Sequence, residues 1–312
     1  MKVVFMGTPD FSVPVLETLV REGHDVAAVV TQADKPKGRG KEIQFPPVKT
    51  AALEHNITVY QPAKVKAPEF VEILKGINPD VMVVVAFGQI LSREILDIPK
   101  YGCINIHASL LPELRGSAPI QWAIIEGKKV SGVTTMYMDT GIDTGDMIEK
   151  KEILIEDDET GGSLHDKLSE AGAELIVSTL QKLEAGTAVR TPQDHEKSTY
   201  VKMLDKQLGK IDFSMDAEYI ERLVRGLNPW PSAYTGFEGK TLKLWKTAAE
   251  PKQYAESPGT VVAVGRDSIT VATGKGGLVI KELQLEGKKR MSTEDFLRGN
   301  KVTEGMVFGI KD

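Results

Sequence analysis

Three polar side chains between residues 105 and 145 have the chemistry that acyl transfer to a nucleophile requires. Asn105 and His107 alternate along the short apolar run 102–107 (GCINIH), so both side chains are expected to project from one face at the end of a β-strand. An Asn amide can donate to an oxyanion, a His can donate or accept a proton, and a downstream Asp can set the charge of the His or take a proton itself. We therefore predict a catalytic set of Asn105, His107 and Asp143, with a purely structural His107 as the alternative.

The segment also contains two Asp-Thr-Gly triplets, which begin at Asp139 and Asp143 and match the signature of aspartic proteases. Those enzymes hold two carboxylates about 3 Å apart, on separate lobes. Here the two Asp residues lie four positions apart in one segment, which argues against a protease. Asp-Gly and Thr-Gly pairs also form simple turns, and this remains the structural alternative.

The first part of the chain alternates apolar strands with helices. Because these strands are apolar on both faces, the pattern indicates an α/β, Rossmann-like domain with a mostly parallel sheet that is covered by helices on both sides. The turn after the first strand has one Gly and a Pro in place of the dinucleotide fingerprint, which argues against a nicotinamide or flavin cofactor. The expected strands are 2–7, 24–31, 80–87, 102–107, 132–138 and 147–155, and the expected helices are 14–22, 46–56, 68–76, 117–126 and 162–184.

The pattern changes after about residue 205, where short strands are separated by Gly-rich turns. This is typical of a small antiparallel β-barrel, and an OB-like barrel is the specific expectation. We expect a catalytic domain over 1–190, a polar linker over 191–210 and the barrel over 211–312. The expected barrel strands are 241–246, 259–264, 268–273 and 277–285.

Charge is distributed unevenly along the chain. The net charge is −5, with 39 Lys and Arg against 44 Asp and Glu. Residues 206–312 hold 17 basic and 14 acidic residues (+3), which leaves 22 basic and 30 acidic residues (−8) in residues 1–205. The excess either is incidental or marks a C-terminal part that meets a polyanion.

The segment 34–41 (DKPKGRGK) is basic and rich in Gly. It is not a phosphate-binding P-loop, because no Ser or Thr follows the last Lys and the spacing differs. It is either a solvated loop or a nucleic-acid contact in which several cations neutralise phosphates. The candidate cations are Lys35, Lys37, Arg39 and Lys41.

The single cysteine, Cys103, excludes an intramolecular disulfide and a thiolate-rich metal site. The apolar run at the N-terminus is too short for a signal peptide, and no run approaches the roughly 20 residues that span a bilayer. We expect a cytoplasmic protein without a bound metal.

The sequence resembles the methionyl-tRNA formyltransferases along nearly its whole length. The matching pieces are MGTPDFSVPVLETL (6–19), KPKGRGK (35–41), NIHASLLPELRGSAPIQWAI (105–124), TGIDTGDM (140–147) and LNPWPSAYT (227–235). Related versions of the block 105–121 occur in other formyltetrahydrofolate enzymes, so the combination with the first and last pieces points to the tRNA enzymes.

The resemblance implies a reaction and its participants. Asn105, His107 and Asp143 would be the catalytic residues, 10-formyltetrahydrofolate the formyl donor and initiator methionyl-tRNA the acceptor, with no metal and no membrane partner. The enzyme would act as a monomer in translation initiation. The folate-binding stretch would be Ser109, Leu110, Leu111 and Pro112, and the tRNA contacts would be Lys35, Lys37, Arg39, Lys41 and Lys206.

Two rival functions stay open at this point. One is a folate-dependent formyltransferase with a small-molecule or sugar-nucleotide acceptor, against which the terminal barrel and the basic loop argue. The other is a non-catalytic tRNA-binding protein, which would give no reason to keep Asn105, His107 and Asp143 together.

Overall fold

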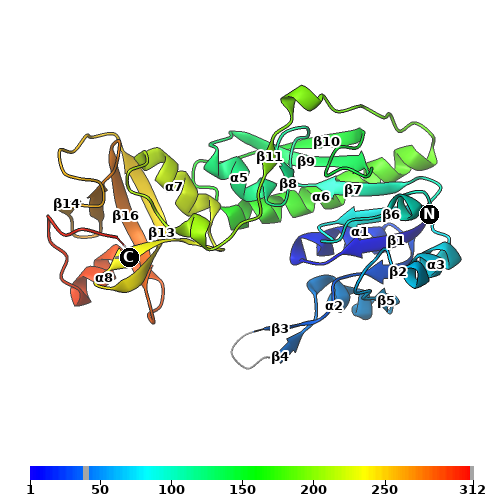
Figure 1. The fold of residues 1–312 in the computed structure, drawn as a ribbon, viewed down its shortest axis with the longest axis horizontal. Helices are drawn as coiled ribbons and strands as arrows, with labels where there is room; N and C mark the ends of the chain where they lie inside the picture. Colours follow the sequence, from blue (N-terminus) through cyan, green and yellow to red (C-terminus); the bar gives the residue numbers. More distant parts are fainter. Residues whose placement is uncertain (38–41, 310–312) are drawn as a thin grey trace. The chain divides into compact units, whose positions relative to one another are not determined.

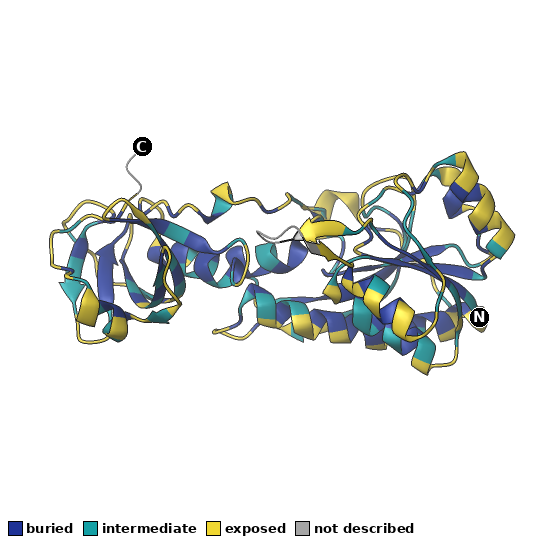
Figure 2. Ribbon diagram, turned by 90° about the horizontal axis from the view of Figure 1, so that it is seen from below, coloured by how far each residue is buried: buried dark blue, intermediate teal, exposed yellow. Residues whose placement is uncertain are grey.

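Each of the two units of the chain has its own sheet and its own core (Figure 1). The computed structural model describes residues 1–37 and 42–309. Unit 1 comprises Met1–Pro119, Val130–Leu154 and His165–Val201, and unit 2 comprises Ile120–Lys129, Ile155–Leu164 and Lys202–Asp312. Figure 2 shows that most strands are buried and that the outward sides of the helices are exposed.

The sheet of unit 1 has seven strands in the order β10-β9-β7-β6-β1-β2-β5. Six of them run in the same direction, and β9 runs antiparallel to both of its neighbours, β7 and β10. The prediction of a mostly parallel, Rossmann-like sheet is therefore confirmed. A short loop joins β9 to β10, and such a loop permits only antiparallel pairing. The strands are β1 (Lys2–Gly7), β2 (Asp25–Val30), β5 (Val59–Tyr60), β6 (Val81–Val85), β7 (Cys103–His107), β9 (Val130–Tyr137) and β10 (Met147–Leu154).

Helices pack on the sheet of unit 1. The long helix α6 contacts β7 and β9. Its Gly172 lies against Ile106 of β7, and the hydroxyl of its Thr179 is hydrogen-bonded to that of Thr135 of β9. The helices of this unit are α1 (Val13–Arg21), α2 (Pro47–Glu54), α3 (Pro68–Ile77), α4 (Arg93–Leu96) and most of α6 (Gly161–Glu184), with short 3₁₀ turns at Asp10–Ser12 and His195–Lys197.

Ser12 precedes α1 but does not cap it through its side chain. Its hydroxyl donates to Val85 O at 2.7 Å. Pro14 occupies the second helical position and has no N–H, so one of the two usual targets of a capping side chain is missing. Ser12 instead ties the start of α1 to the end of β6.

Unit 1 also contains two short strand pairs that are separate from its seven-stranded sheet. β8 (Arg115–Gly116) pairs in parallel with β11 (Tyr200–Val201), so the chain after α6 returns to the segment that follows β7. β3 (Lys35–Lys37) and β4 (Glu42–Gln44) form an antiparallel pair.

Unit 2 contains a six-stranded antiparallel sheet in the order β12-β13-β16-β15-β14, with β17 on β16. Its core includes Phe237, Phe296 and Phe308, whose rings meet edge to face. The helices are most of α5 (Pro119–Ile125), α7 (Ala217–Gly226) and α8 (Thr293–Gly299), with a 3₁₀ turn at Gln207–Gly209. The strands are β12 (Ala233–Phe237), β13 (Lys240–Glu250), β14 (Val261–Val264), β15 (Ile269–Ala272), β16 (Gly277–Leu285) and β17 (Met291–Ser292).

The antiparallel sheet expected in the C-terminal part is confirmed, whereas a closed barrel is not. Within residues 1–37 and 42–309, no strand pairing joins β12 to β14. The main chain of residues 306–309 reaches both ends of the sheet, because Val261 N donates to Met306 O and Gly309 N donates to Gly236 O. Every helix of the described residues is too short or too polar to span a bilayer.

Candidate active site

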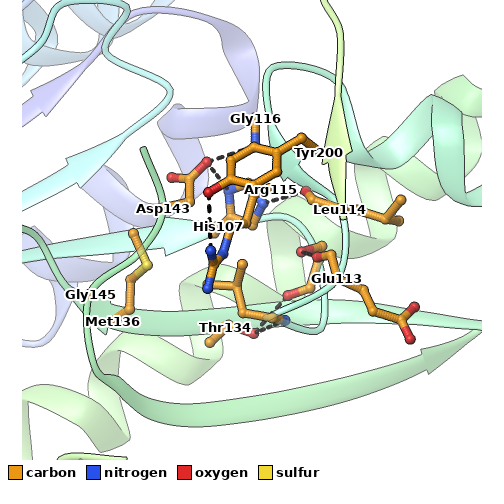
Figure 3. Close-up of polar contacts among 12 residues, drawn as sticks. His107, Glu113, Leu114, Arg115, Gly116, Thr134, Met136, Asp143, Gly145 and Tyr200 are labelled. Atoms are coloured by element: carbon orange, nitrogen blue, oxygen red, sulfur yellow. Dashed lines mark hydrogen bonds and ion pairs between the residues drawn. The ribbon is translucent and has the colours of Figure 1, made fainter. Parts of the chain in front are cut away.

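His107 is the last residue of β7, and its ring is nearly enclosed (Figure 3). Nε2 lies 2.9 Å from Leu114 O. A carbonyl oxygen can only accept, so Nε2 carries a proton. Nδ1 lies 3.7 Å from Asp143 Oδ2, which is longer than a hydrogen bond. Nδ1 is therefore the ring atom left to exchange a proton, and it faces the carboxylate.

Asp143 lies in the loop 138–146, which joins β9 to β10 and folds back toward the end of β7. Its backbone is left-handed, with φ at +54°, a conformation that Asp tolerates better than most residues. Oδ2 accepts the N–H of Gly116 at 2.8 Å. At Gly145, a Cβ would overlap Tyr137 O, so glycine is needed where the loop passes close to β9. The carboxylate is thus fixed in place opposite His107.

Asn105 lies two residues before His107 on β7, so the two side chains share a face about 7 Å apart along the strand. It is half-buried. Among the residues that the structure describes, none forms a hydrogen bond with its amide. This amide is therefore available to a ligand, and the alternation predicted for β7 is confirmed.

The two Asp-Thr-Gly triplets have different surroundings. Asp139 Oδ1 accepts the N–H of Gly141 at 2.9 Å and the hydroxyl of Thr144 at 2.6 Å, and its carboxylate is exposed. These bonds make a local turn. Asp143 alone points at His107, so the structure does not assemble a carboxylate pair.

The predicted folate stretch contains two kinds of side chain. Ser109 and Leu111 are fully buried. The Ser109 hydroxyl donates to Glu113 O at 2.7 Å, and Leu111 packs in a small cluster with two Met side chains. Leu110 and Pro112 are partly exposed. Only Leu110 and Pro112 of the predicted stretch thus have side chains that solvent can reach, while the buried pair shapes the loop.

Thr134 fastens this stretch to the neighbouring strand β9. Its hydroxyl accepts the N–H of Leu111 at 3.2 Å and donates to Ser109 O at 2.7 Å. His107 and Thr134 are register partners across β7 and β9. The loop that follows His107 is thus held by the strand beside it.

Sequence reasoning missed a cluster around Arg115. This side chain is 1% exposed and donates to Gln193 Oε1, to the Tyr200 hydroxyl and to His195 Nδ1. Arg115 lies within the block that carries the resemblance, so a signal was present there. Gln193 lies in the predicted linker, which gave no signal.

The predicted RNA-contacting residues lie apart from this centre in the sequence. Lys35 is exposed on β3, and Lys206 is exposed just before the 3₁₀ turn of unit 2. Lys37 belongs to β3, while Arg39 and Lys41 lie outside the described residues.

Cys103 is the other residue of β7 with reactive chemistry. Burial, followed by the nearby charge of Asp97, raises the pKa of its thiol to about 12. The thiol is thus not a nucleophile near neutral pH. Within the described residues, no group of three or more His, Cys, Asp or Glu side chains could hold a metal ion.

Comparison with known proteins gives consistent matches. Residues 1–180 match the model of the Formyl transferase family, and residues 203–301 match that of the Formyl transferase, C-terminal domain. The chain is 56% identical over 308 residues to the methionyl-tRNA formyltransferase of Agathobacter rectalis, with 99% of each chain covered. It is 54% identical to that of Acetivibrio thermocellus, with 99% of this chain and 100% of that protein covered.

Among solved structures, the chain is similar to WlaRD, a sugar 3N-formyl transferase crystallised with dTDP and 5-N-formyl-THF. The TM-score is 0.68 at 19% identity, covering 93% of this chain and 99% of the other. At that identity the likeness shows a shared fold alone.

Proposed function

The chain belongs to the methionyl-tRNA formyltransferase family, and on this premise we propose that it transfers a formyl group from 10-formyltetrahydrofolate to the α-amino group of initiator methionyl-tRNA, for translation initiation. The similarity extends over 99% of the chain, which supports the substrate as well as the chemistry. The observation that carries the chemistry is the position of His107 Nδ1, 3.7 Å from Asp143 Oδ2.

The amine of the acceptor must lose a proton. An α-amino group has a pKa of about 7.7–8.0, so a large fraction is protonated at neutral pH. Asp143 accepts this proton directly or through water, beside His107. The amine nitrogen then bonds to the formyl carbon, and the bond from that carbon to the folate nitrogen breaks.

Negative charge develops on the formyl oxygen during this attack. The unpartnered amide of Asn105 donates to that oxygen, and such a donor is worth roughly 3–4 kcal/mol in the transition state. His107 acts through Nδ1, because Nε2 is committed to Leu114 O. A proton at Nδ1 either supports the oxyanion or passes to the departing folate nitrogen.

The donor is held beside the loop that follows β7. The partly exposed side chains of Leu110 and Pro112 contact it, and the buried side chains of Ser109 and Leu111 hold the loop in shape. The carbonyl of Leu111 already accepts from Lys150 Nζ. This division follows from burial alone.

We assign residues 1–190 to catalysis, 191–210 to a connection and 211–312 to tRNA binding. Trp245 supports RNA contact, since Lys243 Nζ and Arg290 Cζ lie 5.8 and 5.2 Å from its ring. Cations beside an aromatic ring suit phosphate and base contacts. The bonds made by residues 306–309 support an OB-like barrel in which this segment closes the sheet. We also propose that the protein acts as a monomer in the cytoplasm.

A direct assay tests the function. Wild-type protein and Asp143→Asn are incubated with the folate donor and each of three acceptors, which are charged initiator tRNA, free methionine and an amino-sugar nucleotide. The proposal expects formylation of the charged tRNA and a loss of about a hundredfold or more with Asp143→Asn. Transfer to the sugar nucleotide alone would identify the rival enzyme, and absence of transfer to every acceptor would favour a binding protein.

A further inference from the structure

Arg115 and Gln193 form a buried pair beside the candidate active site. The side chains are 1% and 5% exposed. Arg115 donates to Gln193 Oε1 from Nε at 3.0 Å and from Nη2 at 2.7 Å. The guanidinium also donates to the Tyr200 hydroxyl at 3.1 Å and to His195 Nδ1 at 3.2 Å. Figure 3 shows Arg115 beside Tyr200.

Gln193 connects this pair to the main chain around Asp143. Its Nε2 donates to Asp143 O and to Gly145 O, both at 2.8 Å. A guanidinium can only donate and a carbonyl can only accept, so the partners fix which end of the carboxamide is oxygen and which is nitrogen. Gln193 thus holds the loop on both sides of Thr144, and Arg115 holds Gln193.

The carboxylate of Asp143 is held from the same place. Gly116, the residue after Arg115, donates its N–H to Asp143 Oδ2 at 2.8 Å. Arg115 N in turn donates to Thr199 O at 2.8 Å, within the parallel pairing of β8 with β11. Asp143 is therefore anchored at its side chain and at its main chain by two neighbours that meet at Arg115.

We propose that Arg115 and Gln193 are positioning residues that keep Asp143 facing His107, and that the segment 190–201 is part of the catalytic apparatus and not only a connection. This inference rests on the proposed role of Asp143. A left-handed residue such as Asp143 persists where its surroundings hold it. A displacement of about 1 Å at a reacting group can lower turnover roughly a hundredfold, so loss of the anchor is expected to act on kcat.

The decisive variant is Gln193→Glu. A carboxylate keeps the oxygen that Arg115 uses but has no N–H for the carbonyls of Asp143 and Gly145. We expect kcat to fall about tenfold to a hundredfold, with the KM values for folate and tRNA within about twofold of wild type. If Gln193 only packs and satisfies Arg115, Gln193→Glu keeps wild-type kcat, and the proposal is overturned.

A second variant covers the case in which Gln193→Glu does not fold. Arg115→Lys keeps the charge but loses the planar fork that holds Gln193 Oε1 from two nitrogens. We expect a smaller fall in kcat than for Gln193→Glu, again with unchanged KM values. Glu149→Gln is the matched control, because it removes the charge of a partly buried carboxylate of unit 1 that bonds to Ser178 and Thr179 of α6, and it changes no contact around Asp143. An equal fall in kcat for Arg115→Lys and Glu149→Gln would show a general effect of stability and refute the proposal.

A double-mutant cycle separates this inference from the proposed function. If Gln193 acts through Asp143, the Gln193→Glu/Asp143→Asn double variant is no slower than Asp143→Asn alone. If the double variant is instead slower by the product of the two single effects on kcat, Gln193 acts independently of Asp143. That result would overturn the inference and leave the role of Asp143 unchanged. Wild-type turnover of Asp143→Asn would instead remove the premise and the inference with it.

Discussion

The candidate active site and the basic segments are built in opposite ways. Around Asp143, the side chains of Arg115 and His107 are enclosed, at 1% and 6% exposure, and each is hydrogen-bonded to a named partner. The predicted RNA contacts Lys35 and Lys206 are exposed. Acyl transfer requires atoms in fixed positions, whereas phosphate recognition requires charge and reach. Substitutions in the first region should therefore change kcat, and those in the second should change the KM for tRNA and its salt dependence.

The largest effect is expected for Asn105→Ala. Because the amide has no partner among the described residues, its removal leaves no buried group unsatisfied, and the melting temperature should stay near that of wild type. Loss of an oxyanion donor lowers kcat by about a hundredfold to a thousandfold. Steady-state kinetics and thermal unfolding of the same preparation measure both quantities.

Asn105→Asp provides the control for shape. It keeps the size of the side chain and replaces the donor with an acceptor, so it should be at least as slow as Asn105→Ala. Wild-type kcat in either variant would remove Asn105 from the catalytic set. It would also contradict the expectation that substitutions in the candidate active site change kcat.

An intermediate effect is expected for Arg39→Ala. Loss of one phosphate contact should raise the KM for tRNA several-fold, and it should reduce the slope of log KM against log salt by about 1. The KM for the folate donor and kcat at saturating tRNA should not change. Formylation rates between 50 and 200 mM salt, roughly the range over which such contacts weaken, measure the slope.

Lys206→Ala is the companion variant in unit 2. If each cation meets its own phosphate, the two changes combine additively in free energy, as expected for independent sites. Contacts from aromatic side chains or the main chain do not depend on salt in this way. If the slope of log KM against log salt is unchanged in Arg39→Ala, the segment 34–41 is a solvated loop that does not contact RNA.

Features that depend on neighbouring residues were predicted from the sequence, whereas contacts between residues far apart in the sequence were not. The alternation of Asn105 and His107 and the mostly parallel sheet follow from local periodicity, and both were predicted correctly. The clamp of Gln193 on the Asp143 loop was not predictable, since the two residues are 50 positions apart and Gln193 sits in a polar stretch without a pattern. The strand β12 and the helices α7 and α8 were also missed. In α7 a local signal was present, because Ile220, Leu223 and Val224 are buried at helical spacing. Local rules place side chains on elements, but the partners that hold them come from tertiary packing.

A small effect, on stability alone, is expected for Glu149→Gln. Its carboxylate accepts from Ser178 at 2.9 Å and from Thr179 at 2.8 Å, and it pairs with Lys182 on α6. Burial alone would raise the pKa of Glu149, but the bonds to Lys182, Thr179 and Ser178 outweigh it and lower the pKa below the usual 4.5. Removing the charge should cost about 1 kcal/mol near neutral pH, after allowance for partial exposure.

The pH dependence gives the sign of this effect. Because the folded pKa lies below the unfolded one, the stabilisation is present above about pH 4.5 and is lost as the pH falls through the folded pKa. The melting temperatures of wild type and Glu149→Gln should thus converge in acid, while kcat at neutral pH stays the same. A constant difference at every pH would assign the effect to shape and not to charge.

The smallest effect is expected at Cys103, which shares a face of β7 with Asn105. Its side chain is 2% exposed, and burial raises the pKa of the thiol to about 12. At pH 8, the thiol is therefore almost entirely in its unreactive protonated form. A thiol reagent such as iodoacetamide should therefore label the unfolded chain but not the native enzyme, whose formylation rate should persist after incubation. Rapid labelling of the native enzyme with loss of activity would show that this face of β7 is accessible in solution. The contrast between an enclosed catalytic strand and exposed basic segments would then be wrong.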